Sequence, residues 1–369
     1  MKQQVGKLGL REYISIAILM VGAKATEDTP TILFNKVHNS SWMLPILSAG
    51  IFFIPLYLLL KIMTLYKDKD LFSVIQKLLG KYLGFIVCLL IFLISSYAIS
   101  FDSRSYSNII RTFYFTTTPN LIIYALLMVV CTYGARKGIQ HIGSVAYLVI
   151  YLSVFSLWFA LMLSMQQSTI QSIFPIWGPG KLEILNQSSQ KVTLFAEFFL
   201  FTMFIPYLPS IKEYKKGTWF AFVYVSIQIS AAIFIYICLF DIGMGGVGYP
   251  FHTAIRFISF GTFLPNVEII FFITWLMSVF IRFTAFLYLN SLMFGRLFKI
   301  KDIEYIIPSL ATIYLLIGSI PEAAVNVSTE FRALSLTIAG PTFAAISIIL
   351  WLSALLKGEF KRDKNRNSM

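Results

Sequence analysis

Charge is what this sequence has least of. Asp, Glu, Lys and Arg make up 13% of its 369 residues, whereas a soluble domain carries roughly a quarter. Hydrophobic residues reach 57%, among them 35 Phe, and the mean hydropathy is +0.77. So little charge cannot cover a surface in water. The composition therefore excludes soluble enzymes, disordered chains and secreted scaffolds, and it indicates a bilayer protein.

Cysteine and histidine are equally scarce, with three of each. Cys88, Cys131 and Cys238 lie inside apolar stretches, which is typical of small buried hydrophobes and not of a disulfide set or a metal site. The sequence has no H-E-x-x-H spacing and no G-x-x-x-x-G-K-[ST] phosphate loop. We therefore expect no catalytic site, no cofactor and no metal, and we do not expect an enzyme.

Long apolar runs, bounded by Pro, Gly and charge clusters, are the main feature that is present. A helix that crosses the hydrocarbon needs about 20 apolar residues, and ten such runs occur. They lie near 11–34, 42–62, 83–112, 119–135, 140–166, 190–210, 217–243, 266–293, 304–320 and 335–356. The sequence predicts an all-α integral membrane protein that forms a single transmembrane domain over 1–369. No A-x-A-like cleavage site follows the basic start, so we expect the first apolar helix to stay in the protein and not to be removed as a signal peptide.

The net charge of +13 could indicate nucleic-acid binding, but the cations lie between the apolar runs. With the N-terminus inside, 21 of the 30 Lys and Arg fall in cytoplasmic segments and 7 fall outside. The seven are Lys36, Arg104, Arg111, Lys181, Lys191, Arg256 and Arg332. This asymmetry predicts that both termini are cytoplasmic, that the basic tail 357–369 meets anionic headgroups, and that nucleic acid is not a partner.

The ten runs divide into two halves, 11–166 and 190–356, each with five spans. An odd number of spans in each half forces the second half to be inverted relative to the first. The first span of each half is interrupted by charged or helix-breaking residues, which are unfavourable in the hydrocarbon core. These residues are Gly22, Lys24, Glu27, Asp28 and Pro30 in one span, and Glu197, Pro206 and Pro209 in the other. Paired interrupted helices point to a binding site near the membrane midplane.

Three motifs carry a resemblance to a known family. They are FDSRSYSNIIRTFYF at 101–115, YLPSIKEYKK at 207–216, and YPFHTAIRFISFGTFLPNVEIIFFITW at 249–275, which would be a re-entrant outer loop leading into helix 8. Their order and spacing resemble the B subunits of endospore germinant receptors. This branch belongs to the amino acid–polyamine–organocation transporter superfamily, whose LeuT-like fold has a 5+5 inverted repeat with helices 1 and 6 broken.

The resemblance implies a nutrient-sensing subunit of the spore inner membrane. It would bind a small germinant, often an amino acid, and signal to an A subunit and a C lipoprotein subunit. The alternative is a proton- or sodium-coupled amino acid transporter, in which the same site alternates between the two membrane faces. A small amino acid suits the expected pocket, while sugars and nucleosides stay open.

A broken helix exposes backbone N–H and C=O groups that can hold a carboxylate and an ammonium. The residues expected to line the ligand site are Gly22, Ala23, Lys24, Tyr97, Ala98, Phe101, Phe201, Thr202, Phe204, Trp275 and Ser278. The alternatives are plain structural roles: a packing glycine at Gly22, a proline kink at Pro206, a lysine that snorkels to the headgroups, and aromatic rings that only pack.

Charges inside the apolar runs need partners, because an ammonium near mid-membrane is costly unless it is paired. For Lys24 the candidates are Glu197, Glu27 and Asp28. In sodium-coupled relatives helices 1 and 8 share an ion site, so the resemblance implies that Lys24 or Arg282 occupies it as a tethered cation. The residues assigned to gating or charge pairing are Glu197, Arg282, Asp102, Arg104 and Glu268.

Overall fold

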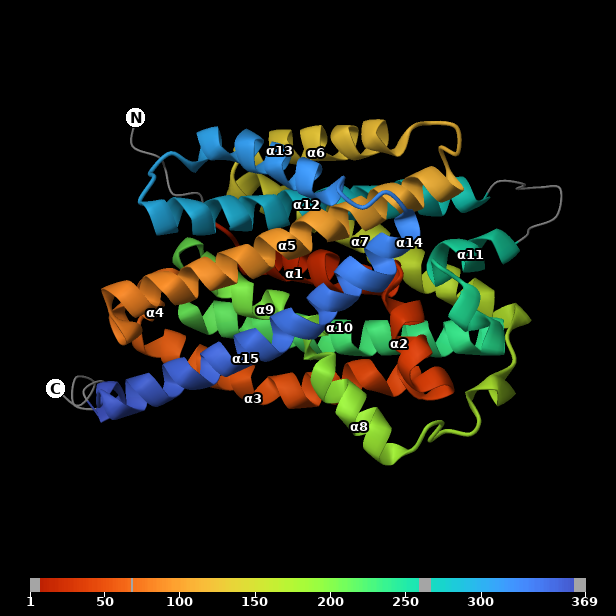
Figure 1. Ribbon diagram of the computed structural model, residues 1–369, viewed down its shortest axis with the longest axis horizontal. Helices are drawn as coiled ribbons and strands as arrows, with labels where there is room; N and C mark the ends of the chain where they lie inside the picture. Colours follow the sequence, from red (N-terminus) through yellow and green to blue (C-terminus); the bar gives the residue numbers. More distant parts are fainter. Residues whose placement is uncertain (1–6, 68, 259–266, 362–369) are drawn as a thin grey trace.

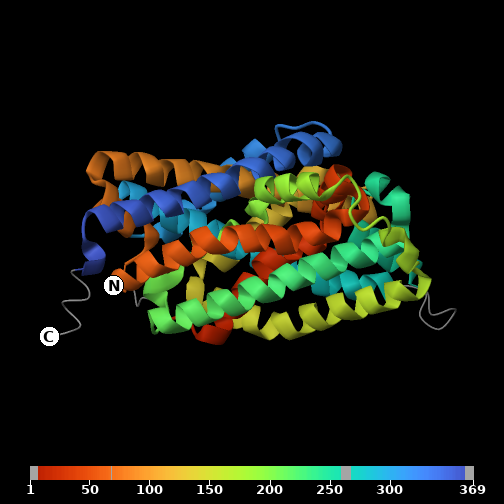
Figure 2. The same ribbon diagram turned by 90° about the horizontal axis from the view of Figure 1, so that it is seen from below.

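The computed structural model describes residues 7–67, 69–258 and 267–361, and within these ranges the regular structure is entirely helical. Long helices lie side by side along the long axis of the molecule in both views (Figures 1 and 2). Helix α1 (Leu10–Gly22) lies inside the bundle, where it packs against α7 (Ile139–Ser164), α10 (Ile211–Phe240) and α12 (Val267–Phe298).

The remaining elements complete this bundle. The α-helices are α2 (Thr29–Val37), α3 (Leu44–Leu65), α4 (Leu71–Leu79), α5 (Lys81–Phe113), α6 (Asn120–Arg136), α8 (Lys181–Gln190), α9 (Glu197–Leu200), α11 (Pro250–Phe257), α13 (Ile306–Gly318), α14 (Ala324–Asn326) and α15 (Ala333–Leu356). Short 3₁₀ segments are η1 (Ala23–Ala25), η2 (His38–Met43), η3 (Met165–Gln167), η4 (Ile170–Ile173), η5 (Val192–Phe195), η6 (Phe201–Tyr207), η7 (Asp241–Gly246) and η8 (Ile303–Tyr305), while η9 (Val327–Arg332) is a π-helix.

Helix occupies each of the ten predicted runs, as far as the described residues reach. Among the described residues, six helical segments are long and apolar enough to cross a membrane, and the shorter apolar segments there are Asn120–Arg136, Val192–Tyr207 and Ile303–Gly318. The prediction of an all-α, multi-pass membrane protein is confirmed. The inverted relation between the two halves stays a prediction. Parts of the predicted outer loop 249–265, of the run 266–293 and of the tail 357–369 lie outside the described residues.

The outer surface of the bundle is apolar. On α7, Leu148 is 77% exposed, and Tyr151, Phe155 and Met162 are each more than 60% exposed. Contiguous apolar surface of this kind is unfavourable in water and favourable against lipid acyl chains. The lipid bilayer is therefore a partner of this surface.

One assignment from the charge pattern is wrong. Arg332 was placed in an outer loop, but the last helical segment begins at Ala324, and Arg332 is only 1% exposed inside it. The helix reaches further than its apolar run because the π-helical stretch Val327–Arg332 carries the Arg332 side chain into the bundle. Such stretches occur often at functional sites.

A close contact between Gly340 in α15 and the segment η5 predicts a strong steric effect. A Cβ atom at Gly340 would lie 2.2 Å from the backbone nitrogen of Thr193 and 2.6 Å from its Cα. We expect Gly340→Ala to lower the free energy of unfolding by about 1–3 kcal/mol or more, because backbone has to move.

The matched control for this substitution is Gly50→Ala in α3, where a Cβ would meet nothing within 4 Å. Since alanine favours helix over glycine by up to about 1 kcal/mol, this variant should be neutral or slightly stabilised. The measurement is the unfolding temperature of both variants in the same detergent. Equal unfolding temperatures for the two variants would contradict the tight packing of α15 on η5.

Candidate functional site

The first span breaks at the predicted position. Helix α1 ends at Gly22, a single 3₁₀ turn covers Ala23–Ala25, and α2 starts at Thr29 with Pro30 in its first turn. Gln228 Nε2 donates a hydrogen bond of 3.2 Å to the Gly22 carbonyl, and a Cβ at position 22 would lie 2.9 Å from that nitrogen. Glycine therefore permits this amide to approach the broken end of the helix.

The sixth span is irregular along its whole length. It consists of η5, one α-helical turn at Glu197–Leu200, and η6 with Pro206 inside it. Its 3₁₀ geometry replaces regular i to i−4 bonding and leaves carbonyl groups free to accept from side chains. The Leu194 carbonyl accepts from Lys24 Nζ at 2.8 Å. The Thr193 carbonyl accepts from Lys24 Nζ at 3.4 Å and also from the backbone N–H of Ala196.

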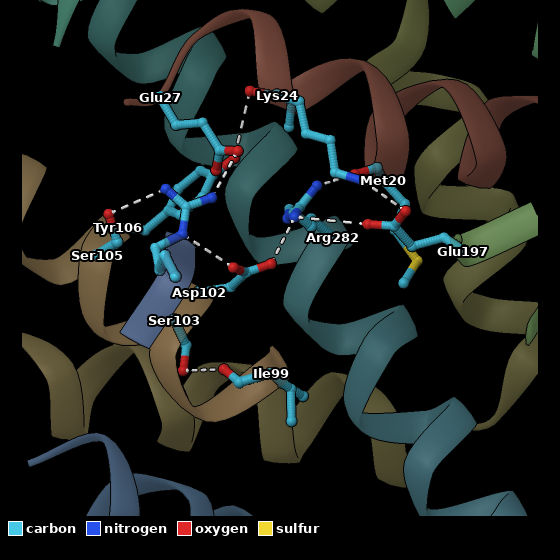
Figure 3. A network of polar contacts seen from close by, with 12 residues as sticks. Met20, Lys24, Glu27, Ile99, Asp102, Ser103, Ser105, Tyr106, Glu197 and Arg282 are labelled. Carbon is cyan, nitrogen blue, oxygen red and sulfur yellow. Dashed lines mark hydrogen bonds and ion pairs between the residues drawn. The ribbon is translucent and has the colours of Figure 1, made fainter. Parts of the chain in front are cut away.

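Lys24 extends from η1 to the sixth span, as Figure 3 shows for its contact with Glu197. Its Nζ lies 2.5 Å from Glu197 Oε2, 2.8 Å from the Leu194 carbonyl and 3.4 Å from the Thr193 carbonyl. The side chain is only 3% exposed. Of the three carboxylates considered as partners from the sequence, Glu197 is the one that contacts the ammonium.

Arg282 connects α12 to the broken end of α1. Its Nη1 donates to the Met20 carbonyl, and its Nη2 lies 2.9 Å from Asp102 Oδ2 and 3.9 Å from Glu197 Oε1 (Figure 3). The guanidinium also lies over the ring of Tyr106, 5.5 Å from its centroid. A fixed positive charge therefore stands between α1 and α12, on the Met20 carbonyl of α1.

Arg332 is a further buried cation at this place. Its guanidinium lies 2.6 Å from Glu27 Oε1 and 3.0 Å from Asp102 Oδ1, and it also contacts Asp28 Oδ1. Three carboxylates from two elements thus surround one arginine. This arrangement ties η9, which leads directly into α15, to the segment that follows the break after α1 and to α5.

These ionised side chains form one network, which we call the charge cluster. Its members are Lys24, Arg282, Arg332, Glu27, Asp28, Asp102 and Glu197. Asp102 bridges Arg282 and Arg332, and Glu197 bridges Lys24 and Arg282. Three positive charges face four negative charges, which leaves a formal excess of one negative charge. Buried charges of this number are costly unless each one is paired.

A small cavity of about 30 Å³ lies against the charge cluster, between η1, α5, the sixth span, α12 and α15. We call it the charged cavity. The charged side chains Lys24, Glu197, Asp102 and Arg332 line it, together with the hydroxyl-bearing residues Ser95, Thr193 and Ser335, and the remaining lining is apolar. The apolar lining includes Ala98, Leu200, Phe286, Leu336, Ala339 and Phe343. A ligand with a cationic group and a small apolar body fits this chemistry.

A second cavity of about 50 Å³ lies on the other side of α1, between α1, α7, α10, α11 and α12. Gly22, Ala23, Trp275 and Ser278 line it, so the structure divides the predicted ligand site between two cavities. Trp275 Nε1 donates to Thr26 Oγ1 at 3.0 Å, next to the helix 1 break. Uncharged groups line this second cavity.

Five predicted site residues line neither cavity. Phe201 packs edge-on against Tyr13, Phe204 packs against Tyr288, and Thr202 Oγ1 donates to the Phe199 carbonyl at 2.6 Å. Tyr97 and Phe101 both contact Phe331: Tyr97 donates to its carbonyl at 3.2 Å, and Phe101 stacks on its ring.

Arg104 and Glu268 lie away from the charge cluster. Glu268 makes a half-exposed ion pair of 3.6 Å with Arg256. Arg104 lies beside Asn120 at the start of α6, where the Asn120 amide oxygen can accept from Arg104 Nη1 at 3.1 Å.

Comparison with known proteins adds the identity of the family. The sequence model of the family described as spore germination protein matches residues 12–327. The chain belongs to the spore germination protein family. The resemblance inferred from the three motifs is thereby confirmed.

Two relatives in this family come from Bacillus subtilis (strain 168). Spore germination protein KB is 23% identical over 301 residues, which are 80% of each chain. Spore germination protein A2 is 26% identical over 298 residues, which are 78% of this chain and 80% of the relative.

Solved structures show that this spore germination family member has a transporter fold. The crystal structure of MhsT in complex with L-phenylalanine superposes with a TM-score of 0.70 at 15% identity, covering 92% of this chain and 87% of MhsT. A manganese transporter of Eremococcus coleocola matches with a TM-score of 0.50 at 10% identity, covering 93% and 76%. One fold thus holds L-phenylalanine in the MhsT structure and forms a manganese transporter in the other protein, so the site and not the fold has to identify the ligand.

Proposed function

We propose that the protein is a nutrient germinant receptor subunit, which binds a small amino acid in the charged cavity between the interrupted first span (α1, η1 and α2) and the interrupted sixth span (η5, α9 and η6). The observation that carries this proposal is the charged cavity itself, in a member of the spore germination family that shares its fold with MhsT. Sensing requires that the ligand bind one conformation more tightly than another. The charge cluster joins five separate elements around the cavity, namely η1, α5, α9, α12 and η9, so a ligand there would bias their packing.

The proposal includes the setting of the protein. The receptor subunit stands in the spore inner membrane with both termini cytoplasmic, and it signals to an A subunit and a C lipoprotein subunit. The charge asymmetry of the sequence supports the orientation, and family membership supports the membrane and the partners.

Uptake of labelled L-amino acids into proteoliposomes that contain the purified chain tests this function. We expect saturable binding without accumulation, and co-purification with A and C subunits when the three are expressed together. Saturable uptake driven by a proton or sodium gradient would contradict sensing as the primary role and would identify a transporter.

A further inference from the structure

The surroundings of Lys24 Nζ are those of a bound primary ammonium. A lysine ammonium has three N–H donors and no acceptor. Here three acceptors surround it: the carbonyls of Thr193 and Leu194, and the carboxylate of Glu197 at 2.5 Å. We call these three groups the ammonium cage. The cage belongs to the sixth span, whereas the ammonium reaches it from the first.

The ammonium cage opens onto the charged cavity. Thr193, Glu197 and Lys24 all line that cavity, which measures about 30 Å³. A void of this size holds about two water molecules, and small-molecule sites are roughly tenfold larger or more. A ligand that reaches the cage therefore has to displace a group that is already there, and Lys24 Nζ is the group whose chemistry matches the cage.

The charge balance favours a cationic ligand group. With every member in its ionised form, the charge cluster has three positive and four negative charges. One additional ammonium would make it neutral, so Lys24 does not have to leave the cluster when a ligand arrives. Asp102 lines the same cavity and is an acceptor for a displaced Lys24. The four-carbon lysine stem is flexible, and it starts from a single 3₁₀ turn and not from a long helix.

We propose that Lys24 Nζ is an internal occupant of the ligand position, and that the primary ammonium group of the ligand takes its place in the ammonium cage. The inference rests on the proposed function, whose site it deepens: it names the ligand group that the cage recognises and the side chain that competes for it. No covalent step is involved. Amino acids and simple primary amines share this ammonium chemistry.

The test is rescue of Lys24→Ala by n-propylammonium, which corresponds to the part of the lysine side chain that this substitution removes. The measurement is the unfolding temperature of the full chain in detergent. We expect a saturable rise for Lys24→Ala, with half-saturation on the order of 1 mM for so small a ligand. The wild type should not respond, because Lys24 fills the cage. Lys24→Met should not respond either, because its side chain fills the same space without a charge.

Three comparisons make the rescue specific. Propan-1-ol has the shape without the charge, tetrapropylammonium has the charge without N–H donors, and sodium chloride supplies a metal cation. None should stabilise Lys24→Ala. The double variant Lys24→Ala/Glu197→Gln should bind n-propylammonium at least about tenfold more weakly, because the cage loses its charged acceptor. If Lys24→Ala does not fold alone, folding in the presence of n-propylammonium is the expected result.

The proposal is overturned if n-propylammonium does not raise the unfolding temperature of Lys24→Ala. It is also overturned if propan-1-ol, tetrapropylammonium or sodium raises that temperature equally. The experiment requires no germinant and no partner subunit, so its outcome is independent of the proposed function.

Labelled L-amino acids then separate the two ligand sources. Binding to Lys24→Ala that is at least tenfold tighter than to the wild type assigns the cage to the amino group of an amino acid. Rescue by n-propylammonium without this gain assigns it to simple amines.

Discussion

Replacement of Arg332 by methionine is expected to cost about 3–5 kcal/mol of stability, because it leaves buried carboxylates without their partner. Arg332 contacts Glu27, Asp28 and Asp102, and it is 1% exposed. Its loss raises the formal excess of negative charge in the cluster from one to two. We expect little folded protein in the membrane, and a large fall in unfolding temperature for whatever is recovered.

The matched control for Arg332→Met is Arg256→Met. Arg256 also pairs with a carboxylate, Glu268, but both side chains are at least one-third exposed. Exposed pairs contribute roughly 0–1 kcal/mol, so this variant should accumulate like the wild type. The double variant Arg332→Met/Asp28→Asn restores the original charge excess and should recover part of the loss. Equal yields of Arg332→Met and wild type would show that the charge cluster does not stabilise the fold.

Arg282 and Asp102 form one ion pair, but their substitutions should differ widely in effect. Arg282→Met removes the cation that contacts Met20 and Asp102, and the cluster becomes more negative. Asp102→Asn removes one negative charge and leaves the cluster neutral. We therefore expect a loss of about 3–5 kcal/mol for Arg282→Met and a much smaller loss for Asp102→Asn, whose amide still accepts hydrogen bonds.

The measurement is chemical or thermal unfolding of both variants under the same conditions as the wild type. A larger loss for Asp102→Asn than for Arg282→Met would contradict the charge balance that we assign to the cluster. The comparison also bears on the further inference, which depends on the same excess of one negative charge.

Much of this architecture follows from the sequence by simple physics. Apolar runs of sufficient length become helices because lipid cannot satisfy an open backbone. Gly22, and the prolines near residue 206, indicate the broken spans because they disrupt regular helix. Lys24 demands a partner, and Glu197, one of three candidates, is the partner observed.

Other parts of the site were not accessible from the sequence. Arg332 was missed because a charge beyond the end of an apolar run resembles a loop residue, and nothing in the pattern predicts a π-helical stretch. A signal was nevertheless present, since the buried acids Glu27 and Asp28 needed a further cation. The Thr193 and Leu194 carbonyls, which accept from Lys24, could not be predicted, because a pattern of side chains does not show which backbone groups a lysine reaches. The division of the predicted site between two cavities depends on side-chain directions in 3₁₀ segments, which the α-helical period does not describe.

The most direct test of the central claim places a bulky side chain in each cavity in turn. Ala98→Leu adds volume to the charged cavity, and Ser278→Leu adds it to the second cavity. Equilibrium binding of a panel of labelled L-amino acids is measured on both variants and on the wild type. The account predicts that Ala98→Leu abolishes binding and that Ser278→Leu retains it. Retained binding in Ala98→Leu together with lost binding in Ser278→Leu would contradict it and would place the ligand on the other side of α1.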